Sequence, residues 1–282
     1  MRHATTPALA TVRHFYDGLA AGYDLMYADW QASIDRQATA LSTLIDAALG
    51  SGEGVAHDVL DCACGIGTQA LGLAARGHRV TGSDLSPVAA GRAAREAAAR
   101  GLGLRTLAAD MTRLPFGDGL FDVVVCADNS LPHLLTPEAV EAALGEMRRV
   151  LRPGGVLLLS TRPYDRLRRE RPASTPPQVR QDTGGRVVTF QLWHWRPDGE
   201  RYDLEHFQLL PGGAGEAGDA AYEVRTRRTS YWALSQAQLT AFARRAGLTE
   251  PAWHEPEESG FFQPVLVARG PGADGEGPPR PT

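Results

Sequence analysis

Short apolar runs alternate with amphipathic stretches between residues 59 and 161, and this alternation organises the chain. The runs predict five strands, over Val59–Cys62, His78–Ser83, Leu104–Ala109, Phe121–Ala127 and Val156–Thr161. Helices are predicted between them, over Thr68–Arg76, from Ser86-Pro87 to Arg100 and from Thr136-Pro137 onward. Strand–helix alternation at this spacing predicts right-handed βαβ units in a doubly wound, Rossmann-like, mostly parallel α/β sheet.

The segments on either side of this region have other patterns. Leu41, Leu44, Ile45, Ala48 and Leu49 recur at helical spacing, so residues 1 to about 50 are predicted to be helical. After a turn at 152–155 and the fifth strand, the Arg- and Pro-rich residues 164–184 predict a loop. Antiparallel strands are then predicted over Arg186–Trp195, Arg201–Leu209 and Tyr222–Tyr231, a capped helix over Ser235–Gly247 and a last strand over Gln263–Arg269.

These patterns divide the chain into four parts. Residues 1–54 are expected to form an N-terminal helical lid segment, and residues 55–163 with 233–269 a Rossmann-like core. Residues 164–232 form a small antiparallel β cap, inserted after the fifth strand. Residues 270–282 are rich in Gly and Pro, so we expect a disordered tail.

Composition narrows the classes of partner. The 282 residues carry a formal net charge of −4, and all 29 basic residues are Arg, so we expect no nucleic-acid or membrane partner. No apolar run approaches the roughly 20 residues that span a bilayer, and the first residues lack a signal-peptide core. Three cysteines do not make a disulfide framework, and nothing completes Cys62-x-Cys64 as a metal site. A cytoplasmic protein without a metal is expected.

One motif at the first strand–helix junction carries candidate chemistry. Gly65 and Gly67 let the backbone turn tightly and approach a ligand, next to the free N–H groups of a helix start. Ala70 replaces the third glycine of a dinucleotide motif, and the acid Asp61 suits a cationic amino-acid portion better than a pyrophosphate. Nicotinamide binding is therefore the less favoured interpretation.

Acids also follow the next two strands. Asp84 ends the second strand, where it can accept hydrogen bonds from ribose hydroxyls. Asp110-Met111 follows the third, and offers an acid for an adenine amine with an apolar flank for the ring. Each acid alone could instead be a helix cap or a solvated loop residue. Together they lie at the strand ends where open α/β sheets bind ligands.

This pattern resembles the class I S-adenosylmethionine-dependent methyltransferases from about Val55 to Thr161, including Leu151–Gly155. The resemblance implies S-adenosylmethionine as cofactor. The residues it assigns to cofactor binding are Tyr27, Arg36, Asp61, Ala63, Gly65, Gly67, Asp84, Leu85, Asp110, Met111 and Asp128.

A narrower resemblance covers most of residues 10–269. The chain is similar to the glycine and sarcosine N-methyltransferases at 15–17, 23–27, 129–134, 161–165 and 229–232. In that family an N-terminal segment closes over the cofactor; Tyr27 matches it here, and the Arg36 guanidinium would bind the methionyl carboxylate. The resemblance also assigns substrate binding to Asn129 and Arg162, and matches a cap tyrosine to Tyr231.

The residue types agree with these roles but leave alternatives open. Arg162 after a strand end can bind a carboxylate bidentately, or be a surface arginine. Asn129 can orient an amine or form a turn, and His133 is either a general base or a packed histidine. Tyr231 is either a pocket residue or part of the aromatic core.

Our leading hypothesis is an S-adenosylmethionine-dependent methyltransferase that N-methylates a small amine such as glycine or sarcosine. One alternative is a tailoring O- or N-methyltransferase of a natural product or amino sugar, with His133 as base; His206 stands near where the glycine enzymes have a tyrosine. A non-catalytic cofactor-binding or interaction protein is the alternative of another class. The partner is then a small-molecule methyl acceptor; its identity is open, as is a homo-oligomer.

Overall fold

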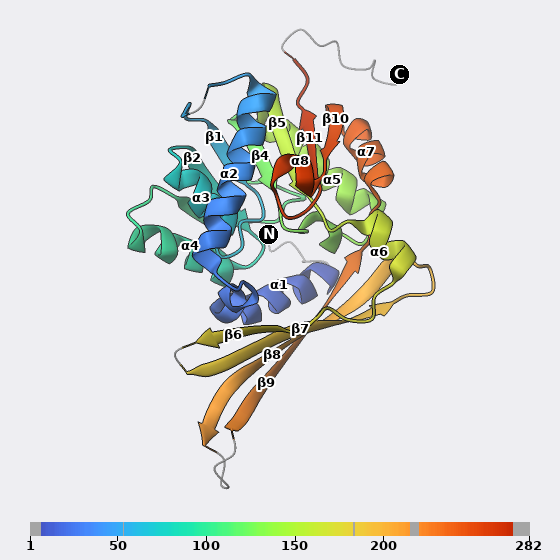
Figure 1. Cartoon of the computed structure of the whole chain (residues 1–282). Coiled ribbons are helices and arrows are strands. Elements are labelled where there is room, and N and C mark those ends of the chain that lie inside the picture. The colour runs from blue at the N-terminus through green and yellow to red at the C-terminus, as the bar shows by residue number, and fades with distance from the viewer. Residues whose placement is uncertain (1–6, 53, 183, 215–219, 273–282) are drawn as a thin grey trace.

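The computed structural model describes residues 7–52, 54–182, 184–214 and 220–272, around a seven-stranded sheet (Figure 1). The strands, in order across the sheet, are β10 (Thr249–His254), β11 (Val265–Arg269), β5 (Leu151–Ser160), β4 (Phe121–Cys126), β1 (Asp58–Asp61), β2 (Arg79–Asp84) and β3 (Arg105–Ala108). β1 to β5 are parallel, whereas β11 and β10 are antiparallel to their neighbours. This arrangement confirms the predicted doubly wound, mostly parallel fold class.

Several of the helices begin next to a capping side chain. The helices are α1 (Pro7–Leu19), η1 (Ala20–Met26), α2 (Trp30–Leu49), α3 (Thr68–Ala75), α4 (Pro87–Ala99), η2 (Leu131–His133), α5 (Pro137–Val150), α6 (Tyr164–Glu170), α7 (Gln236–Arg245) and α8 (Pro256–Ser259). Ser86 Oγ accepts a hydrogen bond from the Ala89 N–H at 3.0 Å, and Ser235 and Gln238 form a capping box. These contacts confirm the predicted starts of α4 and α7.

The central strands are apolar throughout because helices cover both faces of the sheet. In β4, Val123 and Val125 pack in one core with residues of α2 and α3. Val124 and Cys126, which point the other way, pack in a second core with residues of α5 and α7 (Figure 1). Both sets are fully buried, as expected for strands of a parallel sheet.

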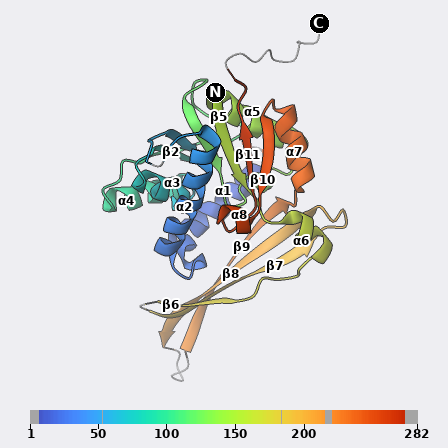
Figure 2. The ribbon, with the colours of Figure 1, turned by 45° about the horizontal axis from the view of Figure 1, so that its top comes forward.

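A second sheet, which we call the cap sheet, lies beyond α1 from the core (Figures 1 and 2). It consists of β6 (Gln178–Asp182), β7 (Gly185–Trp195), β8 (Arg201–Ala214) and β9 (Ala220–Trp232), all antiparallel. α1 contacts both β9 and α4, so it joins the cap sheet to the core. The face of the cap sheet that carries Tyr202, Leu204 and His206 is buried, and we call it the inner face.

Two sequence predictions were wrong. Residues 152–155, predicted to be a turn, belong to β5 as a bulge: Leu151 pairs with Phe121 and Val156 with Val123, so β5 has three more residues than β4 there. The predicted loop over 164–184 contains α6 and β6. α6 is held by the burial of Tyr164 and Leu167. β6 exists because its backbone pairs with β7, which its sequence pattern does not show.

Two further elements, β10 and α8, were not predicted. Directly after β11, the Gly270 N–H donates to the Gly155 carbonyl oxygen at 2.7 Å, beside the β5 bulge. Residues 273–282, most of the segment expected to be disordered, lie outside the described residues. Within the described ranges, none of the helices is long and apolar enough to cross a membrane.

Gly72 lies where α3 packs against α2, and this packing allows a prediction about stability. A Cβ at this position would lie 2.6 Å from Ala38 Cβ and 2.9 Å from the Ile34 carbonyl oxygen. We expect Gly72→Ala to lower the free energy of unfolding by about 1–3 kcal/mol, the usual cost of overpacking. Gly145→Ala in α5 is the matched control, because a Cβ there has no described atom within 4 Å.

Gly145→Ala should raise the free energy of unfolding by about 0.5–1 kcal/mol through helix propensity. Urea unfolding of both variants measures the difference. Equal effects of the two substitutions would show that α2 and α3 are not closely packed at Gly72.

Candidate functional site

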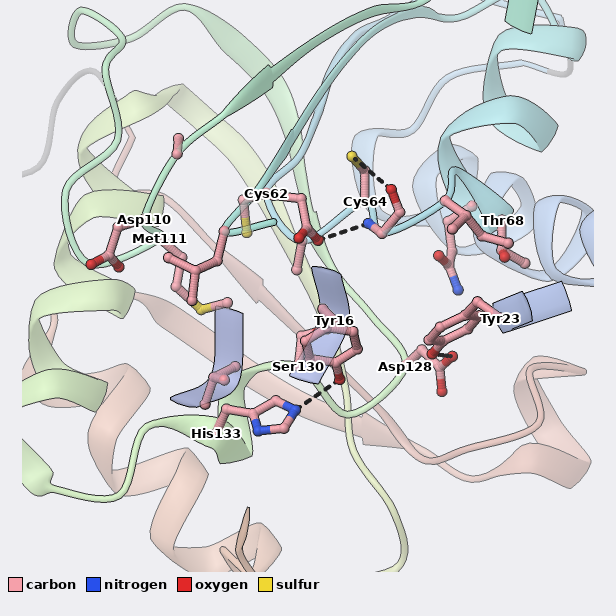
Figure 3. A pocket seen from close by; sticks show the side chains of 18 of the residues that line it. Tyr16, Tyr23, Cys62, Cys64, Thr68, Asp110, Met111, Asp128, Ser130 and His133 are labelled. Carbon is pink, nitrogen blue, oxygen red and sulfur yellow. Dashed lines mark hydrogen bonds between the residues drawn. The ribbon is translucent and has the colours of Figure 1, made fainter. Parts of the chain in front are cut away.

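The site lies where the chain reverses its direction across the sheet. β1 and β4 are neighbours, but β2 and β3 continue on one side and β5 on the other. Ligands of open α/β sheets bind at such a point, outside the carboxyl ends of the strands. A pocket, here the first pocket, is found there between the loops after β1 to β4 and the segment α1–η1 (Figure 3). Its lining includes the predicted site residues Tyr27, Ala63, Gly65, Asp84, Leu85, Asp110, Met111, Asp128 and His133.

The two glycines of the β1–α3 loop have different roles. Gly65 has φ +53°, and a Cβ there would meet no described atom within 4 Å, so the backbone faces open space in the first pocket. Gly67 has φ +99°, and a Cβ there would lie 3.1 Å from both Ala93 Cβ and Leu71. Gly67 therefore permits packing of the loop against α3 and α4, and it does not line the pocket.

Two acids, the buried Asp61 and the half-buried Asp84, accompany this loop. Asp84 accepts hydrogen bonds from the N–H groups of Gly65 and Ser86, each at 2.8 Å, and burial raises its pKa to about 6. Asp61 does not line the pocket. Its Oδ1 accepts from the Ala63 N–H at 3.4 Å, and its Oδ2 has no partner among the residues described. Burial raises the pKa of Asp61 to about 7.

Asp110 and Met111 follow β3, as predicted, at one end of the first pocket (Figure 3). Asp110 Oδ1 accepts from both the N–H and the hydroxyl of Thr112, each at 2.8 Å. These contacts fix the carboxylate orientation beside the apolar Met111 side chain.

Asp128 lies at the end of β4 in a left-handed turn. Asp128 and Asn129 have φ values of 55° and 65°, which are uncommon for residues other than glycine. Asp128 Oδ2 accepts from the hydroxyls of Tyr23 at 3.3 Å and Tyr27 at 3.2 Å, and Oδ1 accepts from Gln263 Nε2 at 3.3 Å. Burial raises its pKa. Figure 3 shows Tyr23 pointing at this carboxylate.

Asp128 and Tyr27 also line a second pocket of about 650 Å³, between the core and the inner face of the cap sheet. Arg36 and Arg162 line this pocket and not the first one. The two pockets therefore meet at Asp128. Arg36 is an exposed residue whose Nη2 donates to Ser33 Oγ at 3.1 Å.

Arg162 is a cation without an acidic partner. Nη1 donates to the Tyr202 hydroxyl at 2.7 Å, and Nη2 donates to Gln191 Oε1 at 3.2 Å. Its guanidinium carbon lies 4.7 Å from the ring centre of Trp193 and 5.2 Å from that of Tyr231. Within the part of the chain that the structure describes, no Asp or Glu forms an ion pair with it.

Asn129 adjoins Arg162. Its Oδ1 accepts from the Arg162 N–H at 3.2 Å, and its buried Nδ2 has no partner in the described ranges. Asn129 therefore holds the β5–α6 connection in place, while its Nδ2 group has no hydrogen-bond partner among the described residues. The structure brings these two predicted substrate residues together.

His133 forms a cluster with two tyrosines. His133 Nε2 is hydrogen-bonded to the Tyr16 hydroxyl at 2.8 Å (Figure 3), and its ring centre lies 4.2 Å from that of Tyr231. Burial lowers the pKa of His133 to about 3, so the ring is neutral near pH 7. Tyr231 is 6% exposed and lies against Tyr202, so it does not line either pocket.

Sequence reasoning assigned no site role to Tyr16, Tyr23 or Gln263. The first two stand in stretches that carried the family resemblance, which was the only signal for them. Gln263 is 135 residues from Asp128, and no local pattern connects them.

Comparison with known proteins agrees with this geometry. Residues 59–155 match the family described as methyltransferase domain. A glycine/sarcosine N-methyltransferase of Parasynechococcus marenigrum is 36% identical over 140 residues, which are 49% of this chain and 48% of that protein. A demethylmenaquinone methyltransferase of Thermus thermophilus is 45% identical over 103 residues, 36% of this chain and 45% of that protein. The chain spans about half the length of these curated relatives.

Solved structures extend the likeness to the cap sheet. An amino pentose methyltransferase from Micromonospora echinaspora, solved with S-adenosylmethionine bound, superposes with a TM-score of 0.65 at 24% identity, over 84% of this chain and 92% of that one. A sugar N-methyltransferase from a Streptoalloteichus species has a TM-score of 0.68 at 22% identity, over 88% and 92%. These similarities show the fold.

Proposed function

We propose that this chain is a class I S-adenosylmethionine-dependent methyltransferase that N-methylates a small amine that carries a carboxylate; its residues 59–155 match the methyltransferase domain family. The main support is Arg162. Its half-buried guanidinium lines the second pocket, where that pocket meets the first at Asp128, and it has no ion-pair partner among the described residues. A carboxylate of the acceptor would pair with it bidentately.

The residues of the first pocket fit S-adenosylmethionine. Gly65 presents open backbone, Asp84 offers a carboxylate to ribose hydroxyls, and Asp110 with Met111 offers an acid and an apolar surface to adenine. The unsatisfied Oδ2 of Asp61 next to the loop suits a cationic amino-acid portion. When bound, this cofactor supplies a methyl group on a positively charged sulfur.

The protein's own contribution to the reaction is positioning. Holding reactants in line can provide about 7–11 kcal/mol of the barrier reduction. In our proposal Arg162 holds the acceptor carboxylate, and Asn129 and Tyr231, which lie outside both pockets, position Arg162 through the hydrogen bond to its N–H and the ring beside its guanidinium. Asp128, at the junction of the pockets, places a carboxylate near the positive charge that passes from the cofactor sulfur to the acceptor nitrogen.

His133 is not the base in this proposal. Burial lowers its pKa to about 3, so the neutral ring is too weak a base to take a proton from the acceptor near neutral pH. We infer that His133 holds the Tyr16 hydroxyl in place. The amine then reaches the site in its neutral form, and its proton leaves after methyl transfer. The rate should therefore rise with pH toward the pKa of the acceptor amine.

A natural product or an amino sugar is the second candidate acceptor. The observation that favours it is the size of the second pocket: at about 30 Å³ per water, a volume of about 650 Å³ has room for roughly twenty waters. A glycine would replace few of them. A non-catalytic cofactor-binding protein would bind S-adenosylmethionine without turnover of any acceptor.

The Arg162 assignment predicts a loss of discrimination. Wild-type enzyme should prefer serine over serinamide and glycine over glycinamide, because only the acids carry a carboxylate. Arg162→Lys cannot reproduce the planar fork, so the preference should fall about tenfold to a hundredfold, as expected for charge-assisted hydrogen bonds of about 1.5–3 kcal/mol. Release of adenosylhomocysteine measures each rate.

Arg201→Lys is the matched control, because Arg201 also lies over an aromatic ring, 4.7 Å from the centre of Trp232, but outside both pockets. It should keep wild-type discrimination. Equal discrimination by Arg162→Lys would remove Arg162 from the carboxylate site. Good turnover of amines without a carboxylate would favour the second candidate acceptor.

The Asp84 assignment predicts pH-dependent cofactor binding. Only the ionised carboxylate accepts freely from ribose hydroxyls, and burial raises its pKa to about 6. The affinity for S-adenosylmethionine should therefore be highest above pH 7 and should fall about tenfold by pH 5, as expected for protonation of one group. Calorimetric titration across this range measures the change.

Asp84→Asn should weaken binding at pH 7.5 by about 1–3 kcal/mol and reduce the pH dependence. Asp118→Asn, at an exposed acid far from the pocket, serves as control. A flat wild-type profile, or wild-type affinity in Asp84→Asn, would remove Asp84 from the cofactor site.

A further inference from the structure

His206 on β8 is a buried polar side chain whose hydrogen bonds are unmade. The residue is 2% exposed, it lines the second pocket, and neither ring nitrogen has a partner within the described part of the chain. A buried polar group without a partner is destabilising, and such groups are rare in native proteins. The imidazole therefore requires a partner other than the described residues.

The neighbours of His206 are engaged elsewhere. Gln191, opposite it in the β7–β8 register, accepts at Oε1 from both Arg162 Nη2 and Trp193 Nε1 at 3.2 Å. Gln208, two residues along β8, donates through Nε2 to the Gly22 carbonyl oxygen at 2.9 Å. Arg227, opposite on β9, is a cation and offers no acceptor. These side chains on the inner face of the cap sheet therefore do not bind the imidazole, and its partner is a molecule in the second pocket.

The ring is neutral in this environment. Burial, Arg227 and Arg162 lower the pKa of His206 to about 4. A neutral imidazole has one N–H donor and one bare nitrogen acceptor. A hydroxyl group both donates and accepts, so it can satisfy either nitrogen in either tautomer. An ammonium can only donate, and the nearby arginines oppose its charge.

We propose that His206 binds a hydroxyl group of the methyl acceptor, and that the enzyme thereby selects a hydroxylated amine over a smaller amine such as glycine. This inference rests on the proposed methyltransferase function and specifies its acceptor class. The second pocket, of about 650 Å³, has the room for such a molecule. A hydroxy amino acid and an amino sugar share this chemistry, and the experiment separates them.

The test compares matched acceptors that differ in hydroxylation. L-serine is compared with L-2-aminobutyrate, in which a methyl group replaces the hydroxyl, and D-glucosamine with cyclohexylamine. Adenosylhomocysteine release gives kcat/KM for each, expressed per concentration of the neutral amine because the paired amines differ in pKa. We expect wild-type enzyme to prefer the hydroxylated member of at least one pair about tenfold or more, the effect of about one hydrogen bond. The pair that shows this preference tells whether the acceptor is a hydroxy amino acid or an amino sugar.

His206→Phe should bring that ratio close to one. His206→Gln keeps a donor and an acceptor and should retain part of the preference, which a merely structural role would not produce. It also serves where His206→Phe fails to melt cooperatively. His194→Phe is the matched control, because His194 is an exposed histidine on β7 outside the pocket; its ratio should equal that of wild type.

Failures of the two proposals are distinguishable. No cofactor binding and no turnover of any amine would overturn the methyltransferase function itself. Equal turnover of both members of each pair, an unchanged preference in His206→Phe, or cofactor binding with turnover of neither hydroxylated probe would overturn the role of His206. Equal turnover of both members of each pair would identify water as the partner of the imidazole.

Discussion

The half-buried carboxylate of Asp128 is the contact on which the geometry of the site depends. Partly shielded from water, it requires hydrogen-bond donors, and it receives them from Tyr23, Tyr27 and Gln263. The Asp128 N–H donates in turn to Ser160 Oγ at 2.8 Å at the end of β5. One residue therefore ties the N-terminal segment, the neighbouring strand and the loop before β11 to the end of β4. The left-handed turn at 128–129 places the carboxylate between the two pockets.

The segment η1 completes the first pocket because both the core and the cap sheet hold it. Asp24 pairs with Arg92 of α4 at 2.8 Å and with Arg180 of β6 at 3.9 Å. Arg92 also donates to the Ala20 carbonyl oxygen, and Gln208 of β8 donates to that of Gly22. Closure over the first pocket is thus coupled to the position of the cap sheet, which also forms one wall of the second pocket.

The two pockets are built from different kinds of polar group. In the first, backbone groups and acids are fixed at the ends of parallel strands, so the fold itself supplies the chemistry, as in other open α/β sheets. In the second, the polar groups are side chains of the cap sheet and of the β5–α6 connection; among the described residues Arg162 has no ion-pair partner and His206 has no hydrogen-bond partner. In our proposal, discrimination among acceptors depends on those two side chains, because an acceptor that fails to pair with them leaves polar groups unsatisfied.

Local signals in the sequence were sufficient for the parallel sheet and its helix starts, since strand burial and helix capping depend on residues a few positions apart. They were also sufficient to find Gly65, Asp84 and Asp110, because parallel strands bring their carboxyl ends to one edge. The β5 bulge, α6 and β6 were not predictable in this way, because backbone pairing and burial against distant elements decide them. The same holds for Asp128 with Gln263, Tyr16 with His133, and the unpartnered ring of His206. Those contacts join residues far apart in the chain, and whether a buried polar group finds a partner depends on which side chains the tertiary fold places around it.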